Sequence, residues 1–177
     1  MILHLERLTD IQDGRYDTAM ALYAESFPPH EQRQIASQEA ILRDKRYRFE
    51  LVFDGVEWVG LLLCWETKDC IYVEHFCIFP ELRNRHYGQR TLSLLQQSGK
   101  TIVLEIDPPE DWVSCRRAGF YARCGYCTNP YPHVHPPYHV ENSGHRLVVL
   151  SFPKALTETA YQSFYKFLQD VVMYDCF

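Results

Sequence analysis

The sequence has no long apolar run and no start that resembles a targeting segment. Its longest apolar candidate, VGLLLC at residues 59 to 64, is far shorter than the ~20 residues that a membrane-spanning helix needs. The opening segment, MILHLERLTDIQDG, carries acidic residues early and lacks the apolar core of a signal peptide. We therefore expect a soluble protein with no membrane partner.

Positive charge is scarce as well. The 18 Lys and Arg residues are outnumbered by 23 Asp and Glu, which gives a formal net charge of −5. Such a chain lacks a broad electrostatic attraction to phosphate backbones, so we expect no nucleic-acid partner. The 7 cysteines are odd in number and scattered along the chain, which favours reduced thiols and a cytoplasmic location.

Internal repeats, low-complexity segments and linkers rich in Gly and Ser are also absent from the sequence. A length of 177 residues suffices for one domain with a sizeable core and is too short for two comfortable ones. We predict a single domain over residues 1–177, present as a monomer or a homodimer.

Hydrophobic periodicity predicts the secondary structure of the first half of the chain. In order, it indicates a strand at 1–9, helices at 16–27 and 31–46, and strands at 47–53, 56–65 and 70–79. The dipeptide Asp54-Gly55 is the strongest short hairpin signal, because both residues tolerate a positive φ. Three consecutive antiparallel strands are therefore expected.

The second half of the chain continues the alternation of predicted helices and strands. In order, we expect a helix at 88–98, a strand at 100–106, a helix at 107–124, a strand at 146–152 and a helix at 157–173. Asp107, Pro108 and Glu110 form the expected N-terminal signal of a helix that Gly125 ends. The buried stripe expected on the last helix is Ala160, Phe164, Leu168 and Val171. This order predicts an α+β fold, with a mixed, mostly antiparallel central sheet flanked by helices and a C-terminal helix.

A cluster of basic residues, RNRHYG at 83 to 88, lies between a predicted strand and a predicted helix. The unpaired N–H groups at a helix N-terminus, with the positive end of the helix dipole, form an anion site. Two well-known phosphate motifs, the P-loop and Gly-x-Gly-x-x-Gly, do not occur here. The turn is therefore either a different kind of phosphate site or a solvated charged turn.

The segment YVEHFCIFPELRNRHYGQRTLSLL, residues 72 to 95, resembles the central motif of the GNAT superfamily, the acetyl-CoA-dependent N-acetyltransferases. In that family an apolar strand is followed by Pro-Glu, and Gln/Arg-x-x-Gly-x-Gly/Ala then opens a helix. Here Pro80-Glu81 matches, Arg83 takes the Gln/Arg position and Gly88 the last glycine. His86 stands where the family usually has its first glycine, a position that histidine can occupy at some cost.

A second segment, RRAGFYARCGY, resembles the Phe-Tyr-x-x-x-Gly-Phe signature of the same family. Tyr121 takes the Tyr position, Gly125 the Gly position and Tyr126 that of the final aromatic residue. Ser114 stands where many members carry an Asn that contacts the cofactor.

The resemblance extends from residue 1 to about residue 153, and its specific part is 72–126. The final helix and the loop NPYPHVHPPYH, which is rich in proline and histidine, look like a less characterised bacterial branch of the family. The identity of the substrate is therefore not implied by the resemblance.

Membership of this family implies an N-acetyltransferase that moves an acetyl group directly from acetyl-CoA, as co-substrate, to a primary amine. The alternative is a non-catalytic GNAT-like module that binds CoA or docks to a partner. The acceptor stays open among a small amine, an antibiotic, a peptide N-terminus and a lysine. The residues that the resemblance assigns to the cofactor are Phe76, Cys77, Ile78, Arg83, Asn84, Arg85, His86, Tyr87, Gly88, Gln89, Ser114 and Tyr121.

Two side chains are the expected catalytic groups. Glu74 lies on the strand that resembles the cofactor-binding one and could deprotonate the amine, directly or through water. His75 would face the other side of a regular strand, unless a bulge turns it, and Glu105 is a weaker candidate. Tyr121 could protonate the departing thiolate. Cys77 is more simply a small buried hydrophobic residue than a covalent acetyl carrier.

The positions of three further segments in the sequence predict the remaining groups of the thioester site and of the acceptor site. A backbone N–H group between Phe76 and Ile78 is expected to polarise the thioester carbonyl. The segment SFPPHEQR and the loop around 131–139 are expected to frame the acceptor site.

A rival reading concerns CGYCTNPYPHVH, in which Cys124, Cys127, His133 and His135 have the residue types of a zinc site. The histidines follow the second cysteine too closely for a usual zinc module. Redox activity of the Cys-x-x-Cys pair is also disfavoured, because Cys124 ends a predicted helix, whereas reactive pairs lie where a helix begins. We expect these four residues to bind no metal, and we predict no other metal site.

Overall fold

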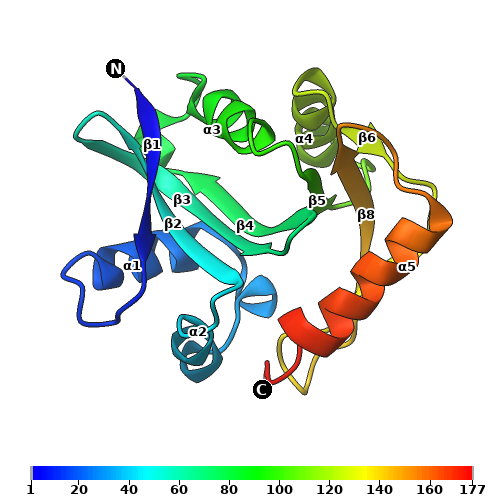
Figure 1. Ribbon diagram of the computed structural model, residues 1–177, viewed down its shortest axis with the longest axis horizontal. Coiled ribbons are helices and arrows are strands. Elements are labelled where there is room, and N and C mark those ends of the chain that lie inside the picture. The colour runs from blue at the N-terminus through cyan, green and yellow to red at the C-terminus, as the bar shows by residue number, and fades with distance from the viewer. Residues whose placement is uncertain (1, 177) are drawn as a thin grey trace.

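The computed structural model describes residues 2–176, and its centre is one mixed β-sheet (Figure 1). The order of the strands is β1-β2-β3-β4-β5-β8-β6, with β7 also paired to β8. All neighbours are antiparallel except β4 and β5. The strands are β1 Leu3–Leu8, β2 Tyr47–Asp54, β3 Glu57–Glu66, β4 Cys70–Ile78, β5 Thr101–Ile106, β6 Cys127–Thr128, β7 His133–His135 and β8 His145–Phe152.

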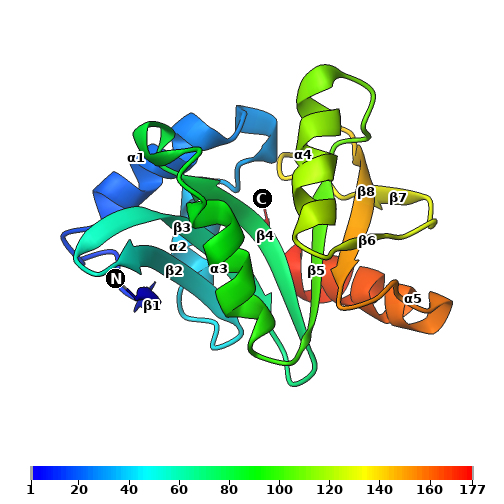
Figure 2. The same cartoon turned by 90° about the horizontal axis from the view of Figure 1, so that it is seen from above.

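Helices cover both faces of this sheet. One core packs α1 and α5 on one face, and the other packs α3 and α4 on the opposite face (Figure 2). The predicted α+β fold with a mostly antiparallel sheet is confirmed. The helices are α1 Tyr16–Ser26, α2 Ile35–Ile41, α3 Tyr87–Gln96, α4 Trp112–Arg123 and α5 Glu158–Phe167; short turns of helix are η1 Pro29–Glu31, η2 Pro80–Leu82 and η3 Leu168–Val172.

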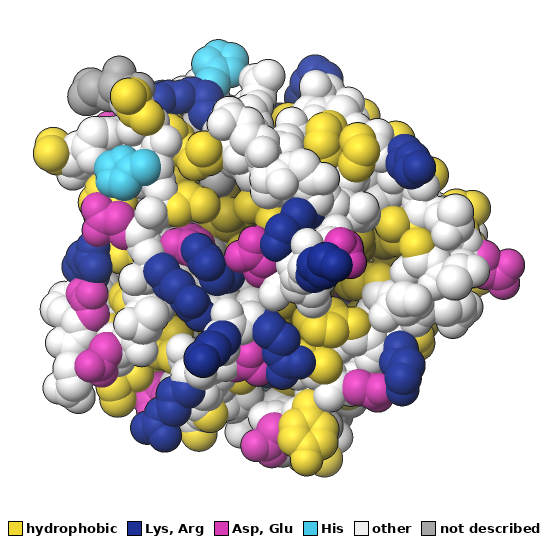
Figure 3. Space-filling view, viewed as in Figure 1, with side chains coloured by type: hydrophobic (Ala, Val, Ile, Leu, Met, Phe, Trp, Pro, Cys, Tyr) yellow, Lys and Arg dark blue, Asp and Glu magenta, His cyan; other side chains and the backbone are white. Residues whose placement is uncertain are grey.

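Among residues 2–176, every helix is too short or too polar to cross a lipid bilayer. On the face drawn in Figure 3, Lys and Arg side chains are interspersed with Asp and Glu. This face therefore presents no continuous basic surface.

The predicted hairpin is confirmed. β2 pairs with β3 in antiparallel register, and Gly55 between them has a φ of 65°. Alternate β2 residues such as Phe49 and Leu51 point into the core beside α1 and α5, while Val52 points into the core beside α3 and α4. The chain can bury both faces of this strand because helices cover each side of the sheet.

The divergence of β4 from β5 creates the space for a site. The two strands run parallel and pair only from Cys70↔Thr101 to Val73↔Leu104, after which they separate (Figure 2). The last five residues of β4 therefore have no neighbouring strand on the β5 side.

A β-bulge lies where the two strands separate. The register between β3 and β4 shifts between Leu63 and Cys64, so that Glu74 is the extra residue. Both Glu74 and His75 consequently face the core beside α1, where Glu74 contacts Trp65 and His75 contacts Tyr23. Because of the bulge, His75 faces the same side of the sheet as Glu74, which a regular strand would not allow.

The predicted second helix, 31–46, is wrong in extent. Only Ile35–Ile41 is α-helical, and η1 precedes it. The chain between them is extended, at Gln32 and Gln34, and this brings the side chain of Arg33 into the core. A continuous helix across these residues could not place Arg33 in that way.

The start of α4 also differs from the prediction. Its N-cap is Asp111, whose carboxylate accepts hydrogen bonds from the N–H groups of Val113 and Ser114. The hydroxyl of Ser114 closes the capping box. Asp107 instead pairs with Arg117, so Asp107, Pro108 and Glu110 are not the helix start. The predicted stop is confirmed, since Gly125 follows the helix with a φ of 86°.

The buried stripe of the last helix is shifted by one residue at both ends. Tyr161 is buried and Ala160 is exposed, and beyond Leu168 the chain forms a π-helical turn that buries Val172. The wider turn rotates the following residues, which a strict helical period does not anticipate.

Candidate active site

A cleft of about 1140 Å³ occupies the gap where β4 and β5 separate. It is lined from one side of the sheet by the turn before α3 and by α4. From the other side it is lined by η1, the end of β5 and the loop that follows β7. The cleft therefore connects the two faces of the sheet, and its two ends are described separately. We call the end at α3 and α4 the cofactor end, and the end at η1 and residues 135–145 the acceptor end.

At the cofactor end, the N-terminus of α3 opens onto the cleft. Asn84 and His86 both have left-handed backbones, with φ of 64° and 62°. His86 is the N-cap of α3, so the histidine adopts the conformation that a glycine would adopt more easily. The first N–H groups of a helix have no partner within it, and here they lie beside the cleft with the positive end of the helix dipole.

Gly88 lies where α3 and α4 pack closely together. A Cβ atom there would lie 3.2 Å from the ring of Phe120 on α4. The absence of a side chain lets α3 and α4 approach each other at the cofactor end.

The side chains assigned to the cofactor differ in their access to the cleft. Arg83, Asn84, His86 and Gln89 are exposed and line it. Tyr87 is buried and donates a hydrogen bond to Glu57 (3.0 Å), so only its backbone is available.

Ser114 and Arg85 are not among the residues that line the cleft. The hydroxyl of Ser114 accepts hydrogen bonds from the N–H groups of Glu110 (3.1 Å) and Asp111 (3.0 Å). Its side chain is thus occupied by capping the helix, and its contacts do not support a cofactor-binding role.

Sequence reasoning missed the contribution of basic residues on α4. Arg116, Arg117 and Arg123 also line the cleft. The three arginines lie on one helix. Their spacing in the sequence does not show which end of the cleft this helix faces.

The open edge of β4 presents backbone donors. The N–H of Phe79 donates to the carbonyl of Val59 on the β3 side (3.1 Å). Because antiparallel pairing alternates, the N–H groups of Phe76 and Ile78 point to the other side, where β5 has diverged. These groups can donate to a carbonyl in the cleft.

Two further side chains lie between the ends. Burial raises the pKa of the Cys77 thiol, so the thiol stays protonated and resembles a buried hydrophobic residue. Tyr121 on α4 lines the cleft and packs against Phe120 and Tyr126, with ring centroids 5.1 and 5.7 Å away. Burial raises the pKa of Tyr121 to about 12, which keeps its phenol available as a proton donor.

At the acceptor end, Glu74 lies in a closed network. One carboxylate oxygen accepts from Arg33 (2.8 Å) and Tyr138 (3.0 Å), and the other accepts from the indole of Trp65 (2.7 Å). Burial alone would raise the pKa of Glu74, but the charge of Arg33 and the hydrogen bond from Trp65 lower it to about 2. Its oxygens are occupied and its carboxylate is a weak base.

His75 is buried beside this network. Its Nε2 lies 2.8 Å from the carbonyl oxygen of Glu31, and its Nδ1 has no hydrogen-bond partner within residues 2–176. Burial lowers its pKa despite the adjacent Glu74, so the imidazole is neutral and anchors the η1 turn.

Glu105 and His135 form the other wall of the acceptor end. The carboxylate of Glu105 accepts from the hydroxyl of Tyr72, contacts Nε2 of His133, and lies 3.9 Å from Nε2 of His135. Burial would raise the pKa of Glu105, but His135 and His133 lower it. The carboxylate thus stays charged behind His135.

The contacts of His135 fix its tautomer. Its Nδ1 lies 2.6 Å from the carbonyl oxygen of Pro136, which can only accept, so Nδ1 carries the proton. In the neutral imidazole Nε2 is then the nitrogen without a proton, and it lies 3.5 Å from the hydroxyl oxygen of Tyr138. His135 lines the cleft, and the carboxylate of Glu105 lies near its Nε2.

The four residues of the rival zinc reading are dispersed. His133 and His135 are turned toward Glu105, while Cys124 caps α4 and Cys127 lies in β6. Within residues 2–176, the group of possible metal ligands that lie close together is His30, Glu31 and His145. The prediction that the four residues bind no metal remains to be tested.

Comparison with known proteins gives structural relatives. No protein-family model matches the chain, and no curated protein matches it. A solved structure from Bacteroides thetaiotaomicron, assigned to the GNAT family as a proposed acetyltransferase, is 28% identical with a TM-score of 0.90. That match covers 96% of this chain and 98% of the other.

Two more distant structures share the fold. An acetyltransferase from Bacillus subtilis, solved in complex with CoA, is 14% identical with a TM-score of 0.54 and covers 85% of this chain and 97% of its own. The ribosomal-protein-S18-alanine N-acetyltransferase from Escherichia coli is also 14% identical with a TM-score of 0.54, covering 88% and 96%.

Proposed function

Because the chain is a member of the GNAT superfamily of acetyltransferases, we propose that it transfers the acetyl group of acetyl-CoA directly to a primary amine. The observation that carries this proposal is the cleft that joins the two faces of the sheet where β4 and β5 separate. A thioester entering from the cofactor end and an amine entering from the acceptor end would meet beside the open edge of β4.

The cofactor end suits a phosphorylated thiol. The backbone N–H groups from Arg83 to Gln89 and the dipole of α3 would hold the pyrophosphate. The backbone of Phe76, Cys77 and Ile78 would hold the arm that carries the thioester, as a strand added to the open edge. Arg116 and Arg123 on α4 add positive charge at this end.

The acceptor end suits an amine that arrives as an ammonium ion. Glu31 and Asp107 line its entrance, and Glu105 lies deeper in the cleft. Negative charge concentrates a cation at this end and repels the anionic cofactor from it. The amine must then lose a proton before it can attack.

We assign the general base to His135. His135 lines the cleft, and in the neutral form of the imidazole its Nε2 carries no proton and can take one from the ammonium group. The proton would then lie between the Tyr138 oxygen and the Glu105 carboxylate, which stabilise it. This residue was predicted as part of the rival zinc cluster and of the loop that frames the acceptor site, but not as the base, because Glu105 lies far from it in the sequence.

Glu74 remains a candidate base, but its contacts favour a positioning role. The hydroxyl of Tyr138 donates its proton to Glu74, and this leaves the Tyr138 oxygen to accept from a protonated His135. Glu74 would therefore act through Tyr138, with Arg33 neutralising its charge.

In the transfer the nitrogen loses two protons and the sulfur gains one. His135 first takes the proton of the ammonium group and passes it to solvent. The neutral amine nitrogen then forms a bond to the thioester carbon, and His135 takes the second proton that this nitrogen loses. The N–H groups of Phe76 and Ile78 stabilise the negative charge on the carbonyl oxygen. The carbon–sulfur bond then breaks, Tyr121 gives its proton to the leaving thiolate and regains one from solvent, and the products are the amide and free CoA.

A thiol-release screen tests the proposal. The purified chain is incubated with acetyl-CoA and a panel of small polyamines, aminoglycosides, peptides with free N-termini and lysine peptides. We expect release of free CoA that depends on at least one amine, with a matching acetylated product in mass spectrometry. Binding of CoA without amine-dependent release across the panel would favour a non-catalytic module instead.

A further inference from the structure

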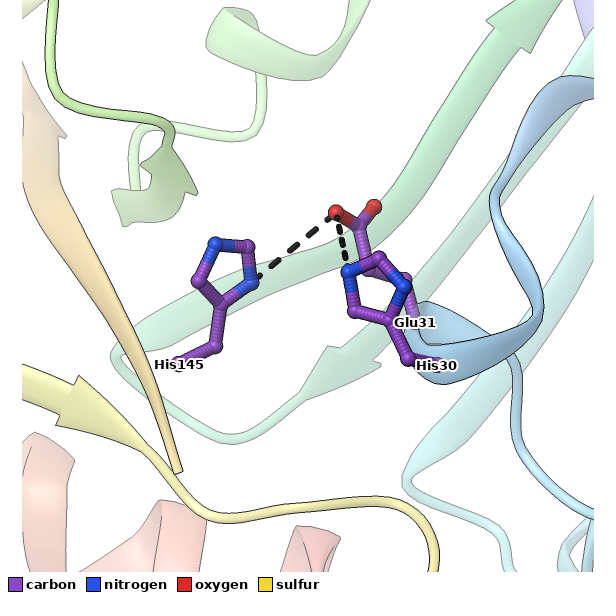
Figure 4. Close-up of side chains that lie close together, drawn as sticks. All are labelled: His30, Glu31 and His145. Atoms are coloured by element: carbon purple, nitrogen blue, oxygen red, sulfur yellow. Dashed lines mark ion pairs between the residues drawn. The ribbon is translucent and has the colours of Figure 1, made fainter. Parts of the chain in front are cut away.

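Three side chains of metal-binding type converge at the entrance of the acceptor end (Figure 4). His30 and Glu31 lie on η1, and His145 is the first residue of β8. Their nearest ligand atoms all lie within 4.8 Å of one another. Two distant segments of the chain thus place two imidazoles around one carboxylate.

The spacing of these atoms resembles that of metal ligands more than that of hydrogen-bonded groups. Oε1 of Glu31 lies 3.6 Å from Nε2 of His30 and 3.9 Å from Nδ1 of His145. Both distances exceed a hydrogen bond. Ligands at the usual 2.0–2.2 Å from a tetrahedral zinc ion would be about 3.3–3.6 Å apart, so small side-chain movements suffice to close the site.

A second carboxylate lies behind one of the imidazoles. Nε2 of His145 lies 3.5 Å from Oδ1 of Asp107, while the other oxygen of Asp107 accepts from Arg117 (2.7 Å). Metal-bound histidines usually donate their second N–H to such a carboxylate, which fixes the ring and makes the ligand more basic. His145 therefore has a metal-facing nitrogen and a partner for its other nitrogen.

The η1 turn that carries His30 and Glu31 is held in place. Nε2 of His139 lies near the carbonyl oxygens of Pro29 (3.1 Å) and Gln32 (2.8 Å), and Nε2 of His75 lies 2.8 Å from that of Glu31. A ligand set on a fixed turn loses little conformational freedom on binding.

The carboxylate of Glu31 has the imidazoles of His30 and His145 as its ion-pair partners within residues 2–176. Both imidazoles lie beyond hydrogen-bond distance from it. A divalent cation between the carboxylate and the two imidazoles would bind all three groups.

We propose that His30, Glu31 and His145 bind one zinc ion, with Asp107 supporting His145. Two histidines and one glutamate are a ligand set of zinc sites that keep a position open. All three residues line the cleft, so the open position faces the acceptor end. The inference does not depend on the transfer reaction, because it concerns binding alone.

Calorimetric titration of the full chain with zinc chloride, after treatment with a chelator and dialysis, tests the site. We expect one ion per chain, and at least tenfold weaker binding in both His145→Ala and His30→Ala. The side chain of His30 is 54% exposed, so its replacement should not disturb folding. Cobalt should give the visible absorption of a low-coordinate site without a cobalt–thiolate band.

Two control variants make the result specific. His4→Ala removes an exposed histidine that also neighbours a glutamate (3.3 Å) but has no third ligand, and it should leave the affinity unchanged. Cys124→Ser with Cys127→Ser should also leave it unchanged. Absence of binding in the parent chain, or equal binding by the parent and both histidine variants, would overturn the proposal.

The position of the site gives an independent readout. Zinc would add positive charge beside the entrance for a cationic amine, at the opposite end of the cleft from the N-terminus of α3. We expect zinc to leave CoA affinity unchanged and to raise the KM for the amine, an effect that His145→Ala should abolish.

Discussion

The cofactor end of the cleft presents mainly backbone groups of one continuous segment, whose side chains from Arg83 to His86 are exposed. The acceptor end presents buried side chains from separate elements, among them Arg33, Glu74 and His135. Anion binding by N–H groups tolerates changes of side chain, whereas a buried network of charges depends on every member. Substitutions should therefore have small effects at the cofactor end and large effects at the acceptor end.

The largest effect is expected at Arg33. Arg33→Met would leave Glu74 charged and buried, with its side chain 1% exposed, and should lower the free energy of unfolding by about 3–5 kcal/mol in urea denaturation. Arg46→Met, which breaks an ion pair whose arginine is 48% exposed, is the matched control and should cost about 0–1 kcal/mol. Equal costs in the two variants would contradict a network at the acceptor end.

The same ion pair gives a pH dependence. The pKa of Glu74 is about 2 in the folded chain and is near its ordinary value of 4.5 after unfolding. Its stabilising contribution is thus complete above pH 4.5 and is lost as the pH falls toward 2. Acid denaturation of Glu74→Gln should accordingly show a smaller loss of stability in this window than the parent.

The next largest effect is expected on turnover. His135→Gln removes the free imidazole nitrogen and should lower kcat by about 10²–10³-fold, with loss of the acidic limb of the pH–rate profile. Glu74→Gln should lower kcat yet keep that limb, because Glu74 acts through Tyr138. An acidic limb that disappears in Glu74→Gln and persists in His135→Gln would assign the base to Glu74 instead.

Tyr121 lies between the two ends. Tyr121→Phe removes the hydroxyl and keeps the ring packed on Phe120 and Tyr126, so kcat should fall by about 10²-fold with little change in CoA affinity. A fully active variant would show that the thiolate takes its proton from water. Tyr126→Phe, whose hydroxyl is buried outside the cleft lining, is the control and should retain activity.

Smaller effects are expected at the cofactor end. Arg83→Glu places a negative charge beside the N-terminus of α3 and should weaken CoA binding about tenfold, or by about 1.4 kcal/mol, in calorimetry. Arg43→Glu, which lies just after α2 and outside the cleft lining, should leave the affinity unchanged. Unaltered binding in Arg83→Glu would argue against the pyrophosphate site.

The smallest effect is expected at His86. Because its φ is 62°, His86→Gly relieves a left-handed non-glycine residue. The added freedom of glycine in the unfolded chain offsets part of this gain, so the free energy of unfolding should rise by less than about 1 kcal/mol. CoA affinity should be kept or improved, since the contacts come from backbone N–H groups. A marked loss of affinity would show that the imidazole itself contacts the cofactor.

The two ends also differ in how much the sequence reveals. The hairpin at Asp54-Gly55, the α3 turn and the position of His86 could be predicted, because each depends on residues close together in the chain. The environment of Glu74 could not be predicted, because it depends on a bulge opposite Leu63 and on an ion pair with Arg33, which is distant in the sequence. Arg33 was predicted on a polar helix, and no local pattern distinguishes a buried arginine from an exposed one.

Direct transfer within one cleft is tested most directly by initial rates measured with acetyl-CoA and the accepted amine both varied. If the two substrates meet at the edge of β4, double-reciprocal plots intersect, and no acetylated enzyme accumulates when acetyl-CoA is added alone. Parallel lines, together with an acetyl group retained on Cys77 in the absence of amine, would contradict direct transfer and require a covalent intermediate.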